Sequence, residues 1–375
     1  MKKPLIQWAL FLLTGWLLLA VPRAEAKLLC TMTASNIDFG ILSPLAGDTD
    51  VNSTLSITCT AATTDIPGGD GGTRDANICI SFDTGTGGTG ANPRQLANTA
   101  NSGLKANFDL YTTHGHSTVW LNRNGTPSGT PPTITVTMTQ NGGNGGNGGN
   151  SGNGGNGGNG GNSGNGSGTV NQTAISPLLP MIFGRLPGGQ NAVPPGTYLS
   201  VFTNQPIQAW WAKATGSGNV KTDCSPGGSP PESSSSFNMT VTATFVGACQ
   251  TLTAGALTFP STGSLASSVD STSIIDIQCS IATPYKIGLN AGLGAGATTS
   301  NRKMTGPGNK TINYQLYRDS AHTLNWGNDT IVGTDTNNGI GTGSRQSYTV
   351  YGRVLPQTTP PSGSYTDAVT VTVVY

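Results

Sequence analysis

Apolar and polar residues alternate along several short segments of the chain. Residues 55–59 read LSITC, residues 133–139 read TITVTMT and residues 275–279 read IDIQC, with apolar residues at every second position. Because successive side chains of a strand point to opposite faces, this period of two predicts half-buried β-strands. Clusters of Gly, Pro, Asn and Ser separate the segments, and no segment has a convincing helical period. The pattern predicts an all-β chain built from β-sandwiches.

The same set of segments occurs twice in the same order, which indicates a duplicated domain. The distance between the copies is far longer than the period of a solenoid repeat, so the pattern does not indicate a stacked array. A chain of 375 residues also has the length of two ordinary domains, each able to bury a core. We therefore predict an N-terminal domain at residues 27–246 and a C-terminal domain at residues 247–375. The matching segments are NIDFG (36–40) with ALTFP (256–260), STLSITCT (53–60) with SIIDIQCS (273–280), NFDLYTTHGHSTVW (107–120) with NYQLYRDSAHTLNW (313–326), IFGRLP (182–187) with VYGRVLP (350–356), and PGTY (195–198) with SGSY (362–365).

The cysteines follow the same division. In each copy, one pair of cysteines has nearly the same spacing, so an equivalent bridge in each domain is the economical pairing. Six cysteines allow many other connectivities, and the sequence alone does not choose among them. A bridge that closes a loop of this size stabilises a fold by about 3 to 4 kcal/mol in the chain-entropy model, which makes these bridges structural. The predicted disulfides are Cys30 with Cys59, Cys79 with Cys224, and Cys249 with Cys279.

The N-terminus has the pattern of an export signal. Lys2 and Lys3 precede an apolar run at residues 8–21, and the AEA at residues 24–26 is a small-x-small cleavage pattern. We therefore expect residues 1–26 to be a signal peptide, with export through the periplasm to the cell surface. No later stretch approaches the roughly 20 apolar residues that a membrane-spanning helix needs.

Composition narrows the possible functions. Charged residues make up 9% of the chain, well below the usual level of about 25%, and residues of low helix propensity replace them. The net charge of +1 gives no electrostatic basis for binding nucleic acid. Acidic residues are scattered, no Ser-His-Asp or Cys-His arrangement is evident, and the three histidines lack ligand spacing with cysteine. We therefore predict no enzymatic activity, no cofactor and no metal site.

The repeated segments resemble the spore coat protein U domain family, which includes subunits and two-domain tip adhesins of archaic (Csu-type) chaperone–usher pili. The resemblance rests on the two matched cysteine spacings, the LY…W segments that end at Trp120 and Trp326, the YGR at 351–353, and a GxY near the end of each domain. It covers nearly all of the chain after the signal and is closest in the second domain. The first domain departs from it with FGR at 183–185, a longer tail and a large insertion. The resemblance implies immunoglobulin-like β-sandwiches.

The resemblance also implies that a pilin domain lacks its last strand, which a neighbouring subunit donates. The residues give a separate indication, because after PGTY the first domain continues to an alternating strand at 237–245, whereas after GSY the second has only residues 365–375. An open core with an unpaired strand edge invites aggregation until another strand fills it. We therefore expect a periplasmic chaperone, an outer-membrane usher and an adjacent pilin subunit as partners. The predicted edge of the donor-strand groove is Val369, Val371, Val373 and Tyr375.

The position in a fibre is predicted from the other end of the chain. A polymerising subunit needs an N-terminal extension to donate, and only Lys27, Leu28 and Leu29 precede Cys30 after the predicted cleavage site. We expect a chain that accepts a strand without donating one, placed at the end of the polymer with its complete first domain outermost. The leading hypothesis is a pilus tip adhesin that mediates attachment to an abiotic or host surface and biofilm formation.

Two features found only in the first domain are candidates for surface contact. The adjacent pair Trp210 and Trp211 would point to opposite faces of a strand, which leaves at least one free to face solvent, with packing as the alternative. The run PLLPM at 177–181 is apolar and bounded by prolines, and an exposed apolar patch often marks a contact site, with strand burial as the alternative. The surface-binding candidates are Leu178, Leu179, Met181, Trp210 and Trp211.

Residues 141–168 are an almost pure GGN repeat that interrupts the first domain. The segment has no apolar residue to bury, so it cannot build a core. Loop closure costs only about 0.6 kcal/mol per doubling of loop length, so the fold tolerates the insertion. We expect a flexible surface loop, with direct surface contact as the alternative.

Two other functions compete with adhesion through apolar loops. A lectin-like tip would bind a glycan through aromatic and amide groups, and a structural spore-coat or fibre component would bind no ligand. Attachment to bare plastic that sugars do not inhibit separates the leading hypothesis from the lectin-like one. Neighbouring genes for a chaperone and an usher favour either adhesin over a simple coat component.

Overall fold

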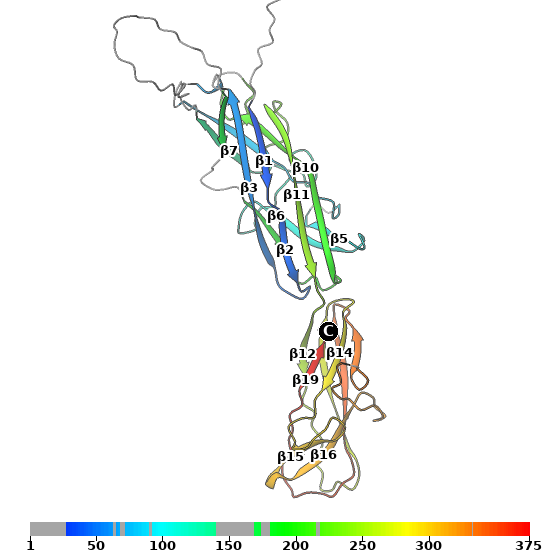
Figure 1. Cartoon of the computed structure of the whole chain (residues 1–375). Coiled ribbons are helices and arrows are strands. Elements are labelled where there is room, and N and C mark those ends of the chain that lie inside the picture. The colour runs from blue at the N-terminus through cyan, green and yellow to red at the C-terminus, as the bar shows by residue number, and fades with distance from the viewer. Residues whose placement is uncertain are drawn as a thin grey trace, which may run out of the picture.

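The computed structural model describes residues 28–62, 65–67, 72–89, 92–139, 169–173, 181–214, 218–331 and 333–375. These residues form β-strands, with a 3-10 turn at Pro307–Asn309 and no α-helix, so the all-β prediction is confirmed. Figure 1 shows two elongated bodies, one built from β1 to β11 and the other from β12 to β19. The predicted domain boundary at 246/247 falls between β11 (Ser233–Phe245) and β12 (Cys249–Ala254). The predicted signal peptide at 1–26 and the GGN segment at 141–168 lie outside the described residues.

The strands of the first domain form one connected path that curls back on itself. The path runs β1-β3-β9-β6-β5-β10-β11-β2, with β4, β7 and β8 attached beside it. The two end strands of the path follow one another in the chain, and the Cys30 N–H on β1 donates to Ser233 Oγ on β11 at 3.1 Å. The strands are β1 (Leu29–Ala34), β2 (Ile37–Leu42), β3 (Thr49–Ala62), β4 (Thr73–Ile80), β5 (Arg94–Asn98), β6 (Lys105–Tyr111), β7 (Thr133–Thr139), β8 (Thr169–Thr173), β9 (Met181–Leu186), β10 (Gly196–Trp211) and β11 (Ser233–Phe245).

The second domain consists of two separate sheets. The larger sheet has the order β12-β13-β18-β16-β15, and the smaller has the order β17-β14-β19. Between them lies a smaller core that includes Ile277, Ile287, Leu289 and Trp326. The strands are β12 (Cys249–Ala254), β13 (Val269–Cys279), β14 (Pro284–Leu289), β15 (Arg302–Thr305), β16 (Thr311–Tyr317), β17 (Asn337–Ile340), β18 (Arg345–Val354) and β19 (Val371–Val374).

The strand order identifies both domains as immunoglobulin-like. In that fold, strands A, B, E and D form one sheet and strands C, F and G form the other. In the first domain, β1, β3, β9 and β6 take positions A, B, E and D, and β4, β10 and β11 take positions C, F and G. In the second domain, β12, β13, β18 and β16 take positions A, B, E and D. Strands β14 and β19 take positions C and F. Among its described residues no strand takes position G.

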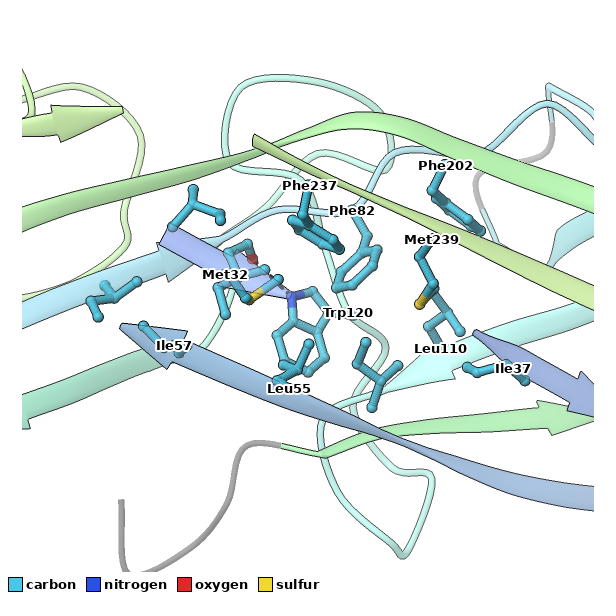
Figure 2. Close-up of a cluster of buried hydrophobic side chains, with 14 of the residues drawn as sticks. Met32, Ile37, Leu55, Ile57, Phe82, Leu110, Trp120, Phe202, Phe237 and Met239 are labelled. Atoms are coloured by element: carbon cyan, nitrogen blue, oxygen red, sulfur yellow. Dashed lines mark hydrogen bonds between the residues drawn. The ribbon is translucent and has the colours of Figure 1, made fainter. Parts of the chain in front are cut away.

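Strand G of the first domain supplies an entire row of core side chains. Phe82 packs edge-to-face against Trp120, Phe202 and Phe237, with ring centroids 5.3, 5.9 and 5.3 Å apart. Figure 2 shows Phe237 and Met239 entering this cluster beside Phe82. The alternation predicted for 237–245 is therefore the inward face of β11, and every second side chain is buried: Phe237, Met239, Val241, Ala243 and Phe245.

Candidate functional site

An apolar groove opens the core of the second domain at position G, which no strand of the described residues occupies. It has a volume of about 940 Å³. One wall is the segment 254–263 after β12, and the other is the segment 359–371 that leads into β19. Core side chains such as Ile275 and Val350 form its lining. Strand β19 pairs with β14 on one side, and among the described residues no strand pairs with its other edge.

Two equivalent tyrosines show what strand G covers in the first domain. The hydroxyls of Tyr198 and Tyr365 each donate to the carbonyl oxygen of a proline four residues earlier, at 2.9 and 2.8 Å. Tyr198 is fully buried and packs edge-to-face against Phe245 of β11, with ring centroids 5.3 Å apart. Tyr365 lines the groove and is only half-buried. The two tyrosines differ in burial because β11 covers Tyr198, whereas no described strand covers Tyr365.

The opposite wall of the groove shows the same difference. Ile37 and Phe39 lie on β2, which runs parallel beside β11, and they are 0% and 5% exposed. Their counterparts in the sequence repeat, Leu257 and Phe259, line the groove and are half-buried. Fully burying a side chain of this kind contributes about 1.5 to 3 kcal/mol. Closing the groove over several such side chains is therefore strongly favourable.

The residues predicted as the groove edge lie along the last segment of the chain. Val369 and Val371 line the groove and are half-buried. Val373 pairs with Ile287 of β14 and is also half-buried. Tyr375 follows the end of β19 and is 60% exposed. Their role as the edge that receives a donated strand stays a prediction.

One polar pair lies in the groove lining and was not anticipated from the sequence. The Tyr314 hydroxyl donates to Asp367 Oδ2 at 2.8 Å, and both residues line the groove. Burial raises the pKa of the Tyr314 hydroxyl, and so do its hydrogen bond to Asp367 and the negative charge of that carboxylate. The hydroxyl therefore stays protonated and acts as the donor of this pair at neutral pH.

The prediction that Trp210 or Trp211 is exposed is wrong. The two side chains point to opposite faces of β10, but their exposed fractions are 0% and 1%. The guanidinium of Arg123 covers the Trp210 ring at 4.7 Å, and that of Arg74 covers the Trp211 ring at 4.0 Å. The Trp210 Nε1–H also donates to the carbonyl oxygen of Ser229 at 2.9 Å. Both rings are therefore structural.

The segment after β10 covers the outer face of Trp210. Cys224 in this segment joins Cys79 of β4, and both cysteines pack against the Trp210 ring. The other two disulfides link directly paired residues of neighbouring strands, β1 with β3 and β12 with β13. The structure thus contains the three disulfides expected from the sequence: Cys30–Cys59, Cys79–Cys224 and Cys249–Cys279.

Of the remaining surface candidates, Met181 is described by the structure and begins β9. Met181 is half-buried and pairs with Thr54 of β3. Leu178 and Leu179 lie outside the described residues. The assignment of these three residues to surface contact stays a prediction.

The arginines of the repeated FGR and YGR motifs form equivalent ion pairs. Arg185 Nε donates to Asp50 Oδ1 at 2.7 Å, and Arg353 Nε donates to Asp270 Oδ1 at 2.7 Å. In each pair a second guanidinium nitrogen reaches the other carboxylate oxygen. The hydrogen bonds from the arginines are the largest cause that lowers the pKa of both carboxylates. These motif residues therefore link β3 to β9 in the first domain and β13 to β18 in the second, rather than presenting a free anion site.

The described residues offer little basis for other chemistry. They contain no group of three or more His, Cys, Asp or Glu side chains placed to hold a metal ion. They also contain no helix with the length and apolar character needed to cross a membrane. The groove is consequently the candidate site with the most structural support.

Comparison with known families places the chain by sequence. The profile of the Spore Coat Protein U domain family matches residues 17–205 and 235–372. The chain belongs to this family, as the resemblance implied. No curated protein matches the sequence.

Several solved structures are similar in shape. The CsuC–CsuE chaperone–tip adhesion subunit pre-assembly complex from archaic chaperone–usher Csu pili of Acinetobacter baumannii matches at 16% identity and a TM-score of 0.47, over 92% of this chain and 100% of that chain. CfaE, the adhesive subunit of CFA/I fimbria of enterotoxigenic Escherichia coli, matches at 9% identity and a TM-score of 0.30, over 90% and 91%. The CupB6 tip adhesin from Pseudomonas aeruginosa matches at 9% identity and a TM-score of 0.27, over 93% and 96%. At these low identities and TM-scores the likenesses carry no functional argument.

Proposed function

We propose that this protein is the tip adhesin of a chaperone–usher pilus. In this proposal the groove of the second domain accepts a β-strand, first from a periplasmic chaperone and then from an adjacent pilin, with assembly at an outer-membrane usher. The first domain faces outward and attaches the pilus to an abiotic or host surface, which promotes biofilm formation. Membership of the Spore Coat Protein U domain family supports the proposal, because the sequence resemblance to this family implies a subunit of a chaperone–usher pilus.

The observation that carries the proposal is the difference between two copies of one fold. In the first domain, β11 pairs antiparallel with β10 and parallel with β2, and it closes the core. In the second domain, the equivalents of β10 and β2 are the two walls of an apolar groove. Adding a strand there satisfies the free edge of β19 and covers the exposed core at once. The occupant expected from this comparison is an extended segment with apolar residues at every second position.

The first domain is placed outward in this proposal because its own strand β11 already closes its core. Its β1 begins at Leu29 and pairs with β3 along its whole length. This strand therefore belongs to the sandwich of its own domain. Among the proposed contact residues, Leu178, Leu179 and Met181 remain after the burial of the two tryptophans.

The proposal is tested by closing the groove within the same chain. A copy of residues 233–245 is fused after Tyr375 through a flexible linker, in the exported full-length protein. We expect a higher thermal midpoint for the second domain and less binding of a hydrophobic dye, because the strand fills the groove. The matched control is the same fusion with its copies of Phe237, Met239 and Val241 changed to Asp. If the two fusions were equally stable and bound equal amounts of dye, the groove would not be a strand acceptor.

A further inference from the structure

Asp367 is the one charged residue among the described residues that line the groove. Asp367 accepts hydrogen bonds from the Tyr314 hydroxyl at 2.8 Å, from the Leu293 N–H at 2.7 Å and from the Ala368 N–H at 2.8 Å. Among the described residues no cationic side chain forms a salt bridge with it. A carboxylate has about four acceptor sites, so it retains capacity for a further donor.

The first domain shows which position of strand G faces this carboxylate. Tyr198 and Tyr365 are equivalent by their matching hydrogen bonds. Ser200 lies two residues after Tyr198 and is therefore equivalent to Asp367, which lies two residues after Tyr365. Ser200 is paired with Val241 of β11, and both are fully buried. Directly paired residues of antiparallel strands have Cβ atoms about 4.5 to 5.5 Å apart. A strand that enters the groove in the same register therefore places one side chain against Asp367.

The chemistry of this contact restricts that side chain. When a strand closes the groove, Asp367 loses its contact with water. A valine, as in the first domain, would leave part of the carboxylate without a donor, and a charged group buried in this way is costly. A threonine has nearly the shape of valine and adds one hydroxyl donor. In the first domain the small hydroxyl of Ser200 imposes no such demand, because it accepts a bond from the Gly87 N–H at 3.1 Å.

We propose that Asp367 is a specificity-determining residue that selects donated strands carrying threonine or serine at the position opposite it. The inference rests on the proposed function of the groove as a strand acceptor. The same register gives the neighbouring positions, since Ala243 is paired with Tyr198 and Met239 with Phe202. The partner strand thus has a large apolar residue, then the hydroxyl residue, then a small residue, at alternate positions. This pattern distinguishes its sequence from a strand that is apolar throughout.

The test varies one position of the strand fused after Tyr375. The fused copy of residues 233–245 either keeps Val241 or carries Val241→Thr or Val241→Leu. Each of these three strands is fused to the full chain with Asp367 and to the full chain with Asp367→Ser. With Asp367 we expect the threonine strand to raise the thermal midpoint of the second domain by at least about 4 °C over the valine strand, because a hydrogen bond to a charged group forms. With Asp367→Ser, which restores the pairing seen in the first domain, we expect the valine strand to be at least as stabilising as the threonine strand.

Two outcomes separate this inference from the proposed function. If no fused strand raised the midpoint, the groove would not accept strands and the proposed function would fail. If the strands stabilised the domain but threonine gave no advantage, or kept its advantage with Asp367→Ser, the role of Asp367 would be wrong while the acceptor groove remained. The matched control is Met239→Thr in the fused strand, which faces Val369 and is expected to lower the midpoint in both backgrounds.

Discussion

The guanidinium of Arg302 donates a hydrogen bond to the main-chain carbonyl oxygen of Trp326, 2.8 Å away, inside the second domain. The first domain contains the same contact between Arg94 and Trp120. Each of these tryptophans also donates its Nε1–H to a carbonyl oxygen of strand C, at 2.8 Å in both domains. The repeated segments that end in tryptophan therefore build the same internal frame twice, which is independent of strand G.

Replacing Arg302 with Met is expected to unfold the second domain selectively. Arg302 is fully buried, and burial lowers its pKa to about 10 while it stays protonated at neutral pH. It donates to the carbonyl oxygens of Asn290, Thr299, Leu289 and Trp326. Removing it leaves the buried carbonyl oxygens of Leu289 and Trp326 without this donor, at a cost of about 3 kcal/mol or more. Thermal unfolding of the whole chain measures the effect, and the exposed Lys310→Met is the control. Equal midpoints for the two variants would contradict the structural role of Arg302.

Deleting the GGN repeat is expected to leave export and folding intact. Residues 141–168 have no apolar residue to bury, and β7 and β8 each pair with other strands of the first domain. The deletion, closed with a short glycine link, is compared with the intact chain for soluble periplasmic yield and thermal midpoint. A large loss of soluble protein would show that the segment is part of the folded structure.

The prediction succeeded where a strand's pattern determines its own surroundings. Leu55, Ile57 and Cys59 alternate with polar residues and all three are buried, because inward and outward positions alternate on a strand beside a core. The sequence repeat also placed the matched cysteines on directly paired strands. Local alternation and internal repetition were therefore sufficient to predict which segments form strands, which of their side chains point into the core, and two of the disulfides.

The prediction failed where a distant segment provides the environment. Trp210 is buried by a loop that has no strand pattern of its own and is held by Cys224 and by hydrogen bonds from Arg123 to Ser225 and Gly227. The hydrogen bond between Tyr314 and Asp367 joins residues that are 53 positions apart in the chain. Neither contact leaves a periodic signal in the sequence.

The ion pair between Asp270 and Arg353 is expected to contribute to stability only above acidic pH. The pKa of Asp270 is lowered in the folded state, from about 3.9 in an unfolded chain. Its contribution is thus complete above pH 4 and is lost as the pH falls through the lower folded value. Asp270→Asn should reduce the thermal midpoint at pH 7, by a small amount because the pair is partly exposed, and the gap to the original protein should close in acid. A gap that did not change with pH would contradict this assignment.

Leu178 and Leu179 are expected to contribute to attachment if the first domain is the adhesive one. Changing both to Ser removes apolar area worth about 25 cal/mol per Å² of buried surface, and many pili per cell multiply the effect. Adhesion of cells to bare plastic should fall, while the amount of pili on the surface stays the same. The control pair is Ile274→Ser and Leu324→Ser, two exposed apolar residues of the second domain. Equal loss for both pairs would indicate a general effect on the pilus rather than contact by the first domain.

Removing the Cys79–Cys224 disulfide is expected to uncover Trp210 without unfolding the rest of the first domain. Trp210 packs with these two cysteines apart from the main core, whereas Trp211 belongs to the main core. The double variant Cys79→Ala, Cys224→Ala loses about 2 to 5 kcal/mol of stability and also frees the loop that covers Trp210. Iodide quenching of tryptophan fluorescence should increase. The increase should disappear when Trp210→Phe is added, because the other tryptophans keep their surroundings. If quenching rose equally in the presence and absence of Trp210, the loss of the disulfide would have opened the main core, and the separate packing of this ring would be wrong.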